Sequence, residues 1–274
     1  GIAAALDKDY LMLKFDRFAI DVAHYHWLGH KTWHPLLSNI SLEVRPGELV
    51  ALVGSSGEGK SLLLQSTLGL LPESMRCRGD IVLDGQVLGD AAKVDQRGKA
   101  LCYVPQGVSA LNPLIKVGPQ LMRAARLGGV QLGLEDVAEQ LQRYNLQPGL
   151  VQEFPRTLSG GMAKRVLACS AALTHARYIL ADEITAWLDD EHACQLLTHL
   201  KGFCQQGRGI LWVTHDLALA ARFADSIAVL HQGELHETLS AQALRENGGS
   251  PWLRSLWAAL PEQQFFARQE PEYA

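Results

Sequence analysis

Residues 54–61 constrain the fold of this chain more than any other segment. They read Gly-Ser-Ser-Gly-Glu-Gly-Lys-Ser, which completes the G-x-x-x-x-G-K-[ST] spacing of a phosphate loop. The apolar residues 49–53 directly before them are typical of a strand buried on both faces, and the apolar residues 62–68 after them favour a helix. A strand, a glycine-rich turn and a helix in this order predict a binding site for nucleotide phosphates.

Each residue type in this loop has a physical reason to be there. Glycines let the backbone curl so that its N–H groups point at phosphate oxygens, and the helix that follows adds its positive end. Lys60 is expected to supply positive charge to the β- and γ-phosphates of ATP, and the Ser61 hydroxyl to ligate Mg²⁺. The predicted ATP-binding residues of the loop are Gly54, Ser55, Ser56, Gly57, Glu58, Gly59, Lys60 and Ser61.

Two adjacent carboxylates form the second chemical motif. Residues 178–183 read as a mostly apolar strand that ends in Asp182 and Glu183. In phosphate-loop enzymes a strand-end aspartate holds Mg²⁺, which predicts this role for Asp182, and Glu183 can polarise the attacking water as a general base. Two solvated acids at a strand end are common in isolation. Together with the phosphate loop, they favour a catalytic pair.

Length and composition describe an ordinary globular chain with an acidic balance. Its 274 residues allow one large α/β domain or two lobes. The net charge of −4 and pI near 6.2 argue against a nucleic-acid partner. The five cysteines show no metal-ligand spacing, which indicates reduced, mostly buried thiols in a cytoplasmic protein. We find no secretory signal and no apolar run long enough to cross a bilayer, so work at a membrane would require a partner.

Strands and helices are expected to alternate along most of the chain. Strands are predicted at 12–22, 40–44, 100–104, 178–181 and 209–213, with a hairpin at 81–88 and a strand pair around 227–237. Helices are predicted at 162–173, 191–204 and 217–223. The alternation predicts an α/β fold with a mostly parallel sheet, interrupted by a mainly helical insertion from about residue 107 to 157.

The sequence Leu158-Ser159-Gly160-Gly161-Met162, followed by a long helix, is the third motif. A Ser-Gly-Gly at a helix start is an anion site made of backbone N–H groups and a hydroxyl, although an ordinary helix cap would look the same. A second phosphate cradle makes sense if it faces the nucleotide of another subunit. With this motif the chain resembles the ATP-binding cassette (ABC) ATPases, whose LSGGQ signature completes the ATP site of the partner in a head-to-tail dimer.

Other landmarks of that family occur in the expected order. The resemblance implies that Gln106 is the Q-loop glutamine that senses Mg²⁺ and the γ-phosphate, and that His215 is the switch histidine. Asp189 matches the end of the D-loop, a segment that crosses the dimer interface. The implied catalytic residues are Glu183, His215 and Gln106, the implied Mg²⁺ ligands Ser61, Gln106 and Asp182, and the implied signature residues Ser159, Gly160 and Gly161.

An aromatic residue upstream of the phosphate loop stacks on adenine in this family. Trp27 is the best match here, with Tyr25 and Trp33 as alternatives. Four histidines surround these residues at positions 24, 26, 30 and 34. The i, i+4 spacing of the last three would align them on a helix, but the resemblance implies strand and loop, so the spacing is weak evidence for a metal site.

The resemblance implies a single ABC ATPase domain over residues 11–261. Residues 11–106 and 162–240 are expected to form a RecA-like phosphate-loop NTPase core with an antiparallel β subdomain. Residues 107–161 should form the inserted helical signature subdomain, residues 241–261 a C-terminal helical segment, and residues 262–274 a tail.

Three residues depart from the family pattern. Ile184 replaces the proline that usually follows the general base, Trp187 replaces a small D-loop residue, and Glu58 adds a negative charge inside the phosphate loop. None removes a catalytic group. They raise the alternative of a weakly hydrolysing, regulatory subunit.

Segments such as Leu68-Gly69-Leu70-Leu71-Pro72 and Ser109-Ala110-Leu111-Asn112-Pro113 resemble the ATPases of peptide, nickel and metallophore importers. This implies transmembrane permease partners, a second and non-identical ABC ATPase, an extracytoplasmic solute-binding protein that acts indirectly, and a peripheral position on the cytoplasmic face of the inner membrane. A non-transport ABC ATPase and an exporter cassette are the alternatives. The chain shows neither a second cassette nor a fused membrane domain.

Overall fold

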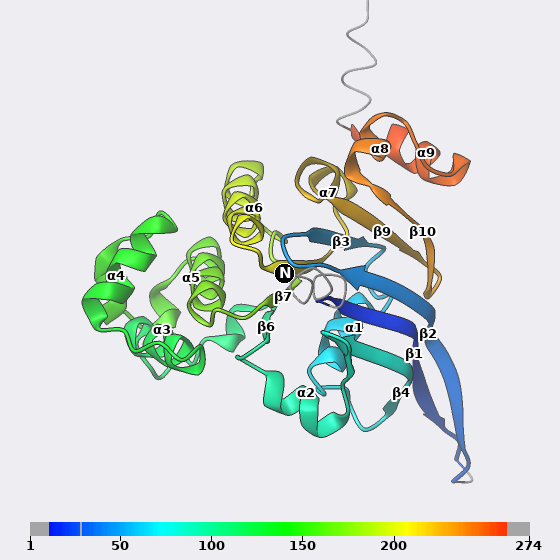
Figure 1. The fold of residues 1–274 in the computed structure, drawn as a ribbon, viewed down its shortest axis with the longest axis horizontal. Coiled ribbons are helices and arrows are strands. Elements are labelled where there is room, and N and C mark those ends of the chain that lie inside the picture. The colour runs from blue at the N-terminus through cyan, green and yellow to red at the C-terminus, as the bar shows by residue number, and fades with distance from the viewer. Residues whose placement is uncertain (1–10, 28, 262–274) are drawn as a thin grey trace, which may run out of the picture.

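The computed structural model describes residues 11–27 and 29–261, which form two β-sheets and a helical lobe (Figure 1). The larger sheet has six strands in the order β10-β9-β3-β8-β7-β6. Its strands are β3 (Leu49–Val53), β6 (Leu101–Val104), β7 (Tyr178–Asp182), β8 (Gly209–Thr214), β9 (Ser226–His231) and β10 (Glu234–Ser240). All neighbours in it pair in parallel except β9 and β10, which confirms the mostly parallel sheet.

The central strands of this sheet are buried on both faces. Every residue of β3, β7 and β8 is buried, as their continuous apolar runs predict. One face packs with the helical lobe and α6 (Asp190–Gln205), and the other packs with α1 (Lys60–Thr67) and the antiparallel sheet. Two hydrophobic clusters therefore pack on opposite faces of this sheet. Together they hold its central strands, and so the ends of these strands, in place.

The smaller sheet is antiparallel and consists of β2 (Lys31–Val44), β1 (Leu13–Tyr25), β4 (Met75–Leu83) and β5 (Gln86–Val87). The predicted hairpin at 81–88 is confirmed, since Asp84 and Gly85 both have positive φ (49° and 81°), as a tight two-residue turn requires. The irregularity expected in the first strand is also present, as a register shift between Phe15 and Phe18. The first two strands are longer than predicted and form a hairpin whose tip projects from the body of the molecule (Figure 1).

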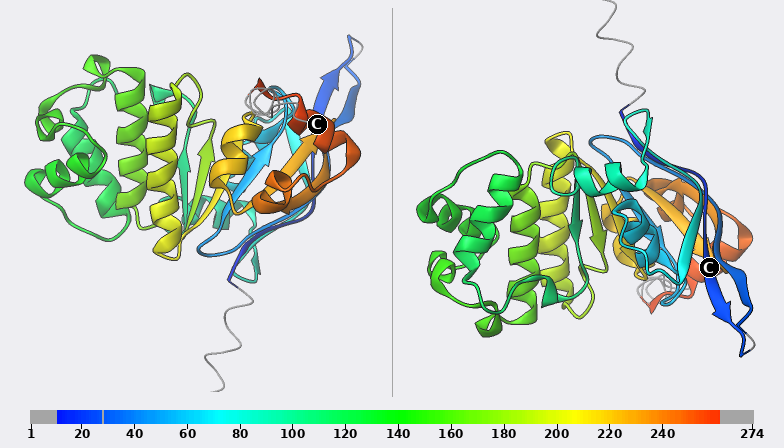
Figure 2. Two further views of the ribbon diagram at one scale, coloured as in Figure 1. Left: turned by 90° about the horizontal axis from the view of Figure 1, so that it is seen from above. Right: turned by 90° about the horizontal axis from the view of Figure 1, so that it is seen from below.

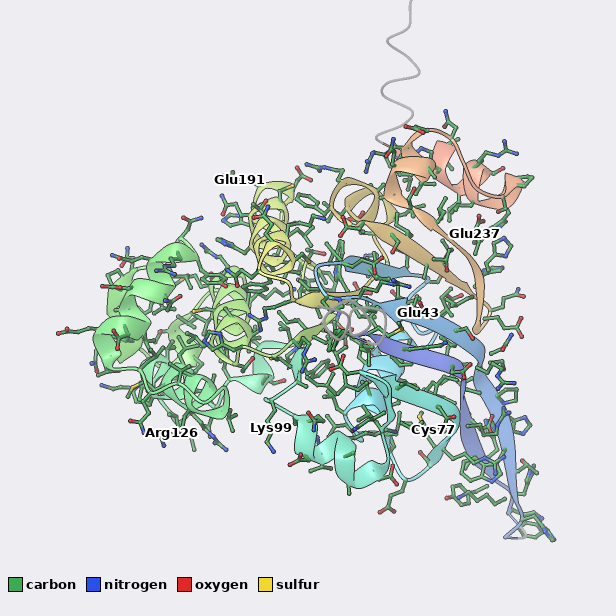
Figure 3. All side chains as sticks on the ribbon, viewed as in Figure 1. Glu43, Cys77, Lys99, Arg126, Glu191 and Glu237 are labelled. Atoms are coloured by element: carbon green, nitrogen blue, oxygen red, sulfur yellow. The ribbon has the colours of Figure 1, made fainter. Side chains whose placement is uncertain are left out.

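The helical lobe lies on the opposite side of the parallel sheet from the antiparallel sheet (Figure 2). It contains the 3₁₀ turns η1 (Val108–Ala110), η2 (Pro148–Gln152) and η3 (Pro155–Thr157) and the helices α3 (Val117–Leu127), α4 (Leu134–Arg143) and α5 (Gly160–Leu173). Figure 3 places Arg126 on this lobe and Glu43 on the antiparallel sheet. Because α5 packs on both α3 and α6, it connects the lobe to the sheet.

The remaining helices are α1 (Lys60–Thr67), α2 (Asp90–Gln96), α6 (Asp190–Gln205), α7 (Leu217–Phe223), α8 (Ala241–Arg245) and α9 (Pro251–Ala258). Helix α2 is not predicted by the sequence, because it is short and mostly polar. The C-terminal helices agree with the segment expected at 241–261, and the tail expected at 262–274 lies outside the described residues. Among the residues described, no helix combines the length and apolarity required to span a bilayer.

The side chain of Arg208 joins α5 to the start of β8. It is 8% exposed, and its guanidinium donates to the backbone carbonyls of Ala171, Ala172 and Ala176. Ala171 and Ala172 lie in the last turn of α5 and Ala176 follows it, so a cation placed here adds donors at this helix end and complements the helix dipole. All five cysteines are free and three are buried, as expected.

Candidate active site

Four strands of the parallel sheet end at the same level. The register pairs Val53 with Thr214, Asp182 with Val213, and Val104 with Ala181. The phosphate loop after β3, the carboxylates at the end of β7, the glutamine after β6 and the histidine after β8 therefore meet at one edge. In open α/β sheets, ligands bind at the carboxyl ends of the strands.

The phosphate loop is shaped as its glycines predict. Gly57 and Gly59 have φ of 84° and 90°, in the left-handed region that a side chain disfavours. Gly59 caps α1, whose first-turn N–H groups have no acceptor within the helix. Lys60 is 4% exposed, and its ammonium donates to the carbonyls of Gly54 (2.7 Å) and Ser55 (2.6 Å). The loop is thus curled around its own lysine.

Burial lowers the pKa of Lys60, and the nearby carboxylates of Glu183, Glu58 and Asp182 oppose that shift. A buried ammonium is stable only where negative groups accompany it. The phosphates of a nucleotide would add to this set, so the lysine is poised to bind them.

Asp182 and Ser61 bring two oxygen donors together beside the phosphate loop. Asp182 is 3% exposed, and its carboxylate accepts from the Ser61 hydroxyl (2.8 Å) and from the Tyr103 hydroxyl (2.9 Å). A carboxylate and a hydroxyl side by side, next to the phosphate loop, are the oxygen donors that Mg²⁺ prefers. These residues fit the cation that the sequence predicts.

Glu183 and His215 are in direct contact. The Nδ1 atom of His215 lies 3.0 Å from Oε2 of Glu183. Glu183 is 7% exposed and has a φ of 46°, which is uncommon outside glycine. Its backbone N–H donates to the carbonyl of Val213 at 2.9 Å. The carboxylate is therefore held at the strand end, oriented by the histidine, as a general base requires.

These residues surround a cavity of about 630 Å³. Its lining includes Lys60, Ser61, Gln106, Glu183 and His215, so the structure brings together most of the predicted catalytic groups. Asp182 does not line the cavity, but its carboxylate accepts a hydrogen bond from Ser61, which does. The phosphate loop contributes Ser56, Gly57 and Gly59 to the same lining.

Glu58 is turned away from the position expected for phosphates. Its carboxylate accepts from the backbone N–H of Ser55 (2.9 Å) and of Gln232 (3.3 Å), and Gln232 lies in the turn between β9 and β10. A Cβ at Gly54 would lie 2.7 Å from the Glu58 carboxylate and 3.0 Å from the backbone carbonyl oxygen of Leu230, so the loop is closely packed at this glycine. Glu58 therefore braces the loop against the neighbouring turn.

The two hydrogen bonds of Glu58 predict that two substitutions at this position differ in their effect on the affinity for ATP. Glu58→Ala should weaken ATP binding about five-fold, or about 1 kcal/mol, since the loop loses two hydrogen bonds that hold its shape. Glu58→Gln keeps one acceptor oxygen and therefore one of the two hydrogen bonds, so its affinity should lie between those of the wild type and Glu58→Ala. Calorimetric titration with Mg-ATP measures both. If the carboxylate instead repelled the phosphates, Glu58→Gln would bind ATP more tightly than the wild type.

The signature residues lie beside a second cavity of about 510 Å³. Gly160 and Gly161 line it, and the Ser159 hydroxyl caps α5 by accepting from the N–H of Met162 (3.2 Å). None of these three signature residues lines the cavity of the phosphate loop. The two cavities are adjacent, since Gln106 and Trp187 line both.

Asp189 and Trp27 line neither of these two cavities. Asp189 caps α6, and its carboxylate accepts from the N–H of His192 (2.8 Å). Trp27 is 94% exposed in the turn between β1 and β2 and does not line the cavity of the phosphate loop. Its proposed contact with adenine stays a prediction. The surrounding histidines lie in strand or turn, as expected, and the rings of His24 and His34 pack at 4.6 Å.

Two residues of the site are missing from the sequence prediction. Tyr103 orients Asp182, and Lys164 in α5 donates to the carbonyl of Ala186. Tyr103 lies in β6, the strand before Gln106, so the sequence predicts it only as a strand residue. The contact of Lys164 depends on how α5 packs on the turn after Glu183, and no local sequence signal predicts it.

The fold and these strand-end groups define a phosphate-loop NTPase with a signature motif, and the comparisons identify its family. The model of the ABC transporter family matches residues 37–186. The oligopeptide transport ATP-binding protein OppD of Lactococcus lactis subsp. cremoris is 32% identical over 82% of this chain and 70% of its own length. The chain belongs to the ABC transporter family, and it is an ATP-binding and ATP-hydrolysing chain of this family.

Two further relatives are importer ATPases. The nickel import ATP-binding protein NikD of Pseudomonas putida is 34% identical over 86% of this chain and 93% of its own length. The glutathione import ATP-binding protein GsiA of Salmonella typhimurium is 31% identical over 82% of this chain, which spans only 39% of the length of GsiA.

Solved structures of cassettes share the fold. The dimeric structure of a bacterial ABC transporter cassette has a TM-score of 0.71 and 26% identity, over 84% of this chain and 98% of that one. A post-hydrolysis dimer of the same cassette, bound to ADP and phosphate, has a TM-score of 0.71 and 25% identity over the same shares. An ATP-bound bacterial exporter of the Atm1 family has a TM-score of 0.67 and 26% identity, over 96% of this chain and 42% of that one.

Proposed function

We propose that this chain hydrolyses ATP to drive uptake of a small solute (a peptide, nickel or a metal chelate) through separate permease subunits. The observation that carries the proposal is the contact of His215 with Glu183 beside Lys60, which gives a base, its orienting partner and a phosphate-binding cation in one cavity. The importer relatives support the direction of transport.

In the proposed reaction, Lys60 and the backbone N–H groups of the loop bind the β- and γ-phosphates. Ser61, Asp182 and Gln106 would hold Mg²⁺, which neutralises charge that develops on the transferred phosphoryl group when it is bound. Glu183 takes a proton from the water that attacks the γ-phosphorus, and ADP and phosphate leave. His215 holds the carboxylate in place.

The signature of a second cassette is expected to cover the bound nucleotide, because the signature of this chain opens into a different cavity from its own phosphate loop. We propose a head-to-tail pair with a non-identical cassette, docked on the permeases at the cytoplasmic face of the membrane. The sequence departures leave the catalytic groups in place. Ile184 is 2% exposed and packs in the main core, and Glu58 points at backbone N–H groups.

The proposal is tested by uptake in the native host. Deleting the gene should abolish uptake of one member of a panel that contains Ni²⁺, a metal chelate and a small peptide. The wild-type gene should restore that uptake, and a gene that encodes Glu183→Gln should not. Unchanged uptake of every member of the panel after deletion would contradict this import function, and export of a panel member in its place would favour the exporter alternative.

A further inference from the structure

Trp187 is exposed to an extent that needs an explanation. It is 95% exposed, more than any other large apolar side chain in the described part of the chain. Its backbone φ is 66°, in the left-handed region, where a bulky residue is a genuine outlier. A residue that combines a strained backbone conformation with a solvated indole is typical of one that contacts another molecule.

The turn that carries Trp187 is anchored on both sides. The N–H of Leu188 donates to the carbonyl of Thr185 at 3.1 Å, and the ammonium of Lys164 donates to the carbonyl of Ala186. Lys164 is 7% exposed, so this contact is shielded from water. These bonds hold the backbone of the turn in place and so fix where the Trp187 side chain leaves the chain.

The position of Trp187 sets what it would meet. It lines both the cavity of the phosphate loop and the cavity of the signature residues. In a head-to-tail pair, each phosphate loop faces the signature of the partner. A two-fold axis then passes between the two cavities of each chain, and residues midway between them meet their own copies. In a pair of identical chains, one Trp187 would therefore face the other.

We infer that Trp187 prevents this chain from closing on a second copy of itself and selects a non-identical cassette with a small residue at the matching position. The inference rests on the head-to-tail pairing proposed above. Two indoles that meet on the axis need more room than one indole against a small residue, and an overpacked interface is destabilised. One indole against a small residue fills the same space without a clash, which discriminates between the two partners.

Self-association in Mg-ATP tests this inference. The background substitution Glu183→Gln prevents hydrolysis, so that any closed dimer persists. By light scattering, the Glu183→Gln chain should remain a 30.0 kDa monomer. The double variant Glu183→Gln, Trp187→Ala should form a homodimer, with a dissociation constant lower by about ten-fold or more. Trp252→Ala in the same background is the matched control, since it removes another partly exposed tryptophan, on α9, and should stay monomeric.

Two results would overturn the inference. One is a Glu183→Gln chain that dimerises as readily as the double variant, and the other is a double variant that binds ATP and still stays monomeric. Both leave the ATPase assignment intact, because ATP binding is measured separately by calorimetry. Absence of ATP binding in the Glu183→Gln chain would instead overturn the nucleotide assignment, and this inference with it.

Discussion

Replacing Glu183 with glutamine should lower the rate of ATP hydrolysis by about 10²–10⁴-fold, the range typical of a lost general base. The amide is isosteric and still accepts a hydrogen bond from His215, but it cannot take a proton from water. Affinity for ATP should remain within a few-fold of the wild type, because Glu183 is not among the groups that hold the phosphates. Phosphate release under saturating Mg-ATP measures the first effect, and calorimetry the second.

Glu191→Gln is the matched control for this variant. Glu191 is an exposed carboxylate in the first turn of α6, outside the cavity, and its loss should leave hydrolysis unchanged. Undiminished hydrolysis by Glu183→Gln in the assembled transporter would remove Glu183 from its role as base.

Replacing Lys60 with methionine should weaken ATP binding by about 100-fold, which corresponds to about 3 kcal/mol. Methionine keeps the length and apolar body of the side chain and removes the charge. The buried ammonium lies near the carboxylates of Glu183 and Asp182, so its loss leaves these charges uncompensated where phosphates should bind. Titration with Mg-ATP gives the affinity directly.

A second buried lysine provides the control for this variant. Lys93 in α2 is 7% exposed and does not line the cavity, so Lys93→Met should bind ATP as the wild type does. A thermal melt of both variants separates loss of binding from loss of the fold. Wild-type affinity in a folded Lys60→Met chain would contradict the role of this lysine.

Much of the site can be predicted from the sequence because its parts are short and local. The phosphate loop needs glycines at fixed positions, and a buried strand directly before it fixes where the loop begins. The same holds for Asp182 and Glu183 at the end of another buried strand. Since parallel strands end at one edge, these local patterns also predict that their residues meet.

The contacts that the sequence does not predict all depend on packing between distant segments. The sequence predicts that Glu58 adds a negative charge near the phosphates. In the structure its carboxylate accepts a hydrogen bond from the backbone N–H of Gln232, about 170 positions further along the chain. The sequence places Lys164 in a helix but does not predict a partner for it. In the structure its ammonium donates a hydrogen bond to the carbonyl of Ala186. Neither partner has a local signal, because a backbone group of any residue type can serve.

The extent of the first hairpin is a further difference. Alternation predicts a strand at 12–22, and the resemblance implies strand and loop for the aromatic and histidine residues that follow, without giving the bounds of the strands. In the structure β1 continues to Tyr25 and β2 begins at Lys31, which leaves Trp27 in the turn. Pairing between the two strands overrides the weak local preference here.

A crystal structure of the Glu183→Gln chain with Mg-ATP and its partner cassette tests the central claim most directly. We expect the β- and γ-phosphates at Lys60, the cation at Ser61 and Asp182, and the signature of the partner over the γ-phosphate. A nucleotide bound outside the cavity of the phosphate loop, or one covered by the signature of its own chain, would contradict it.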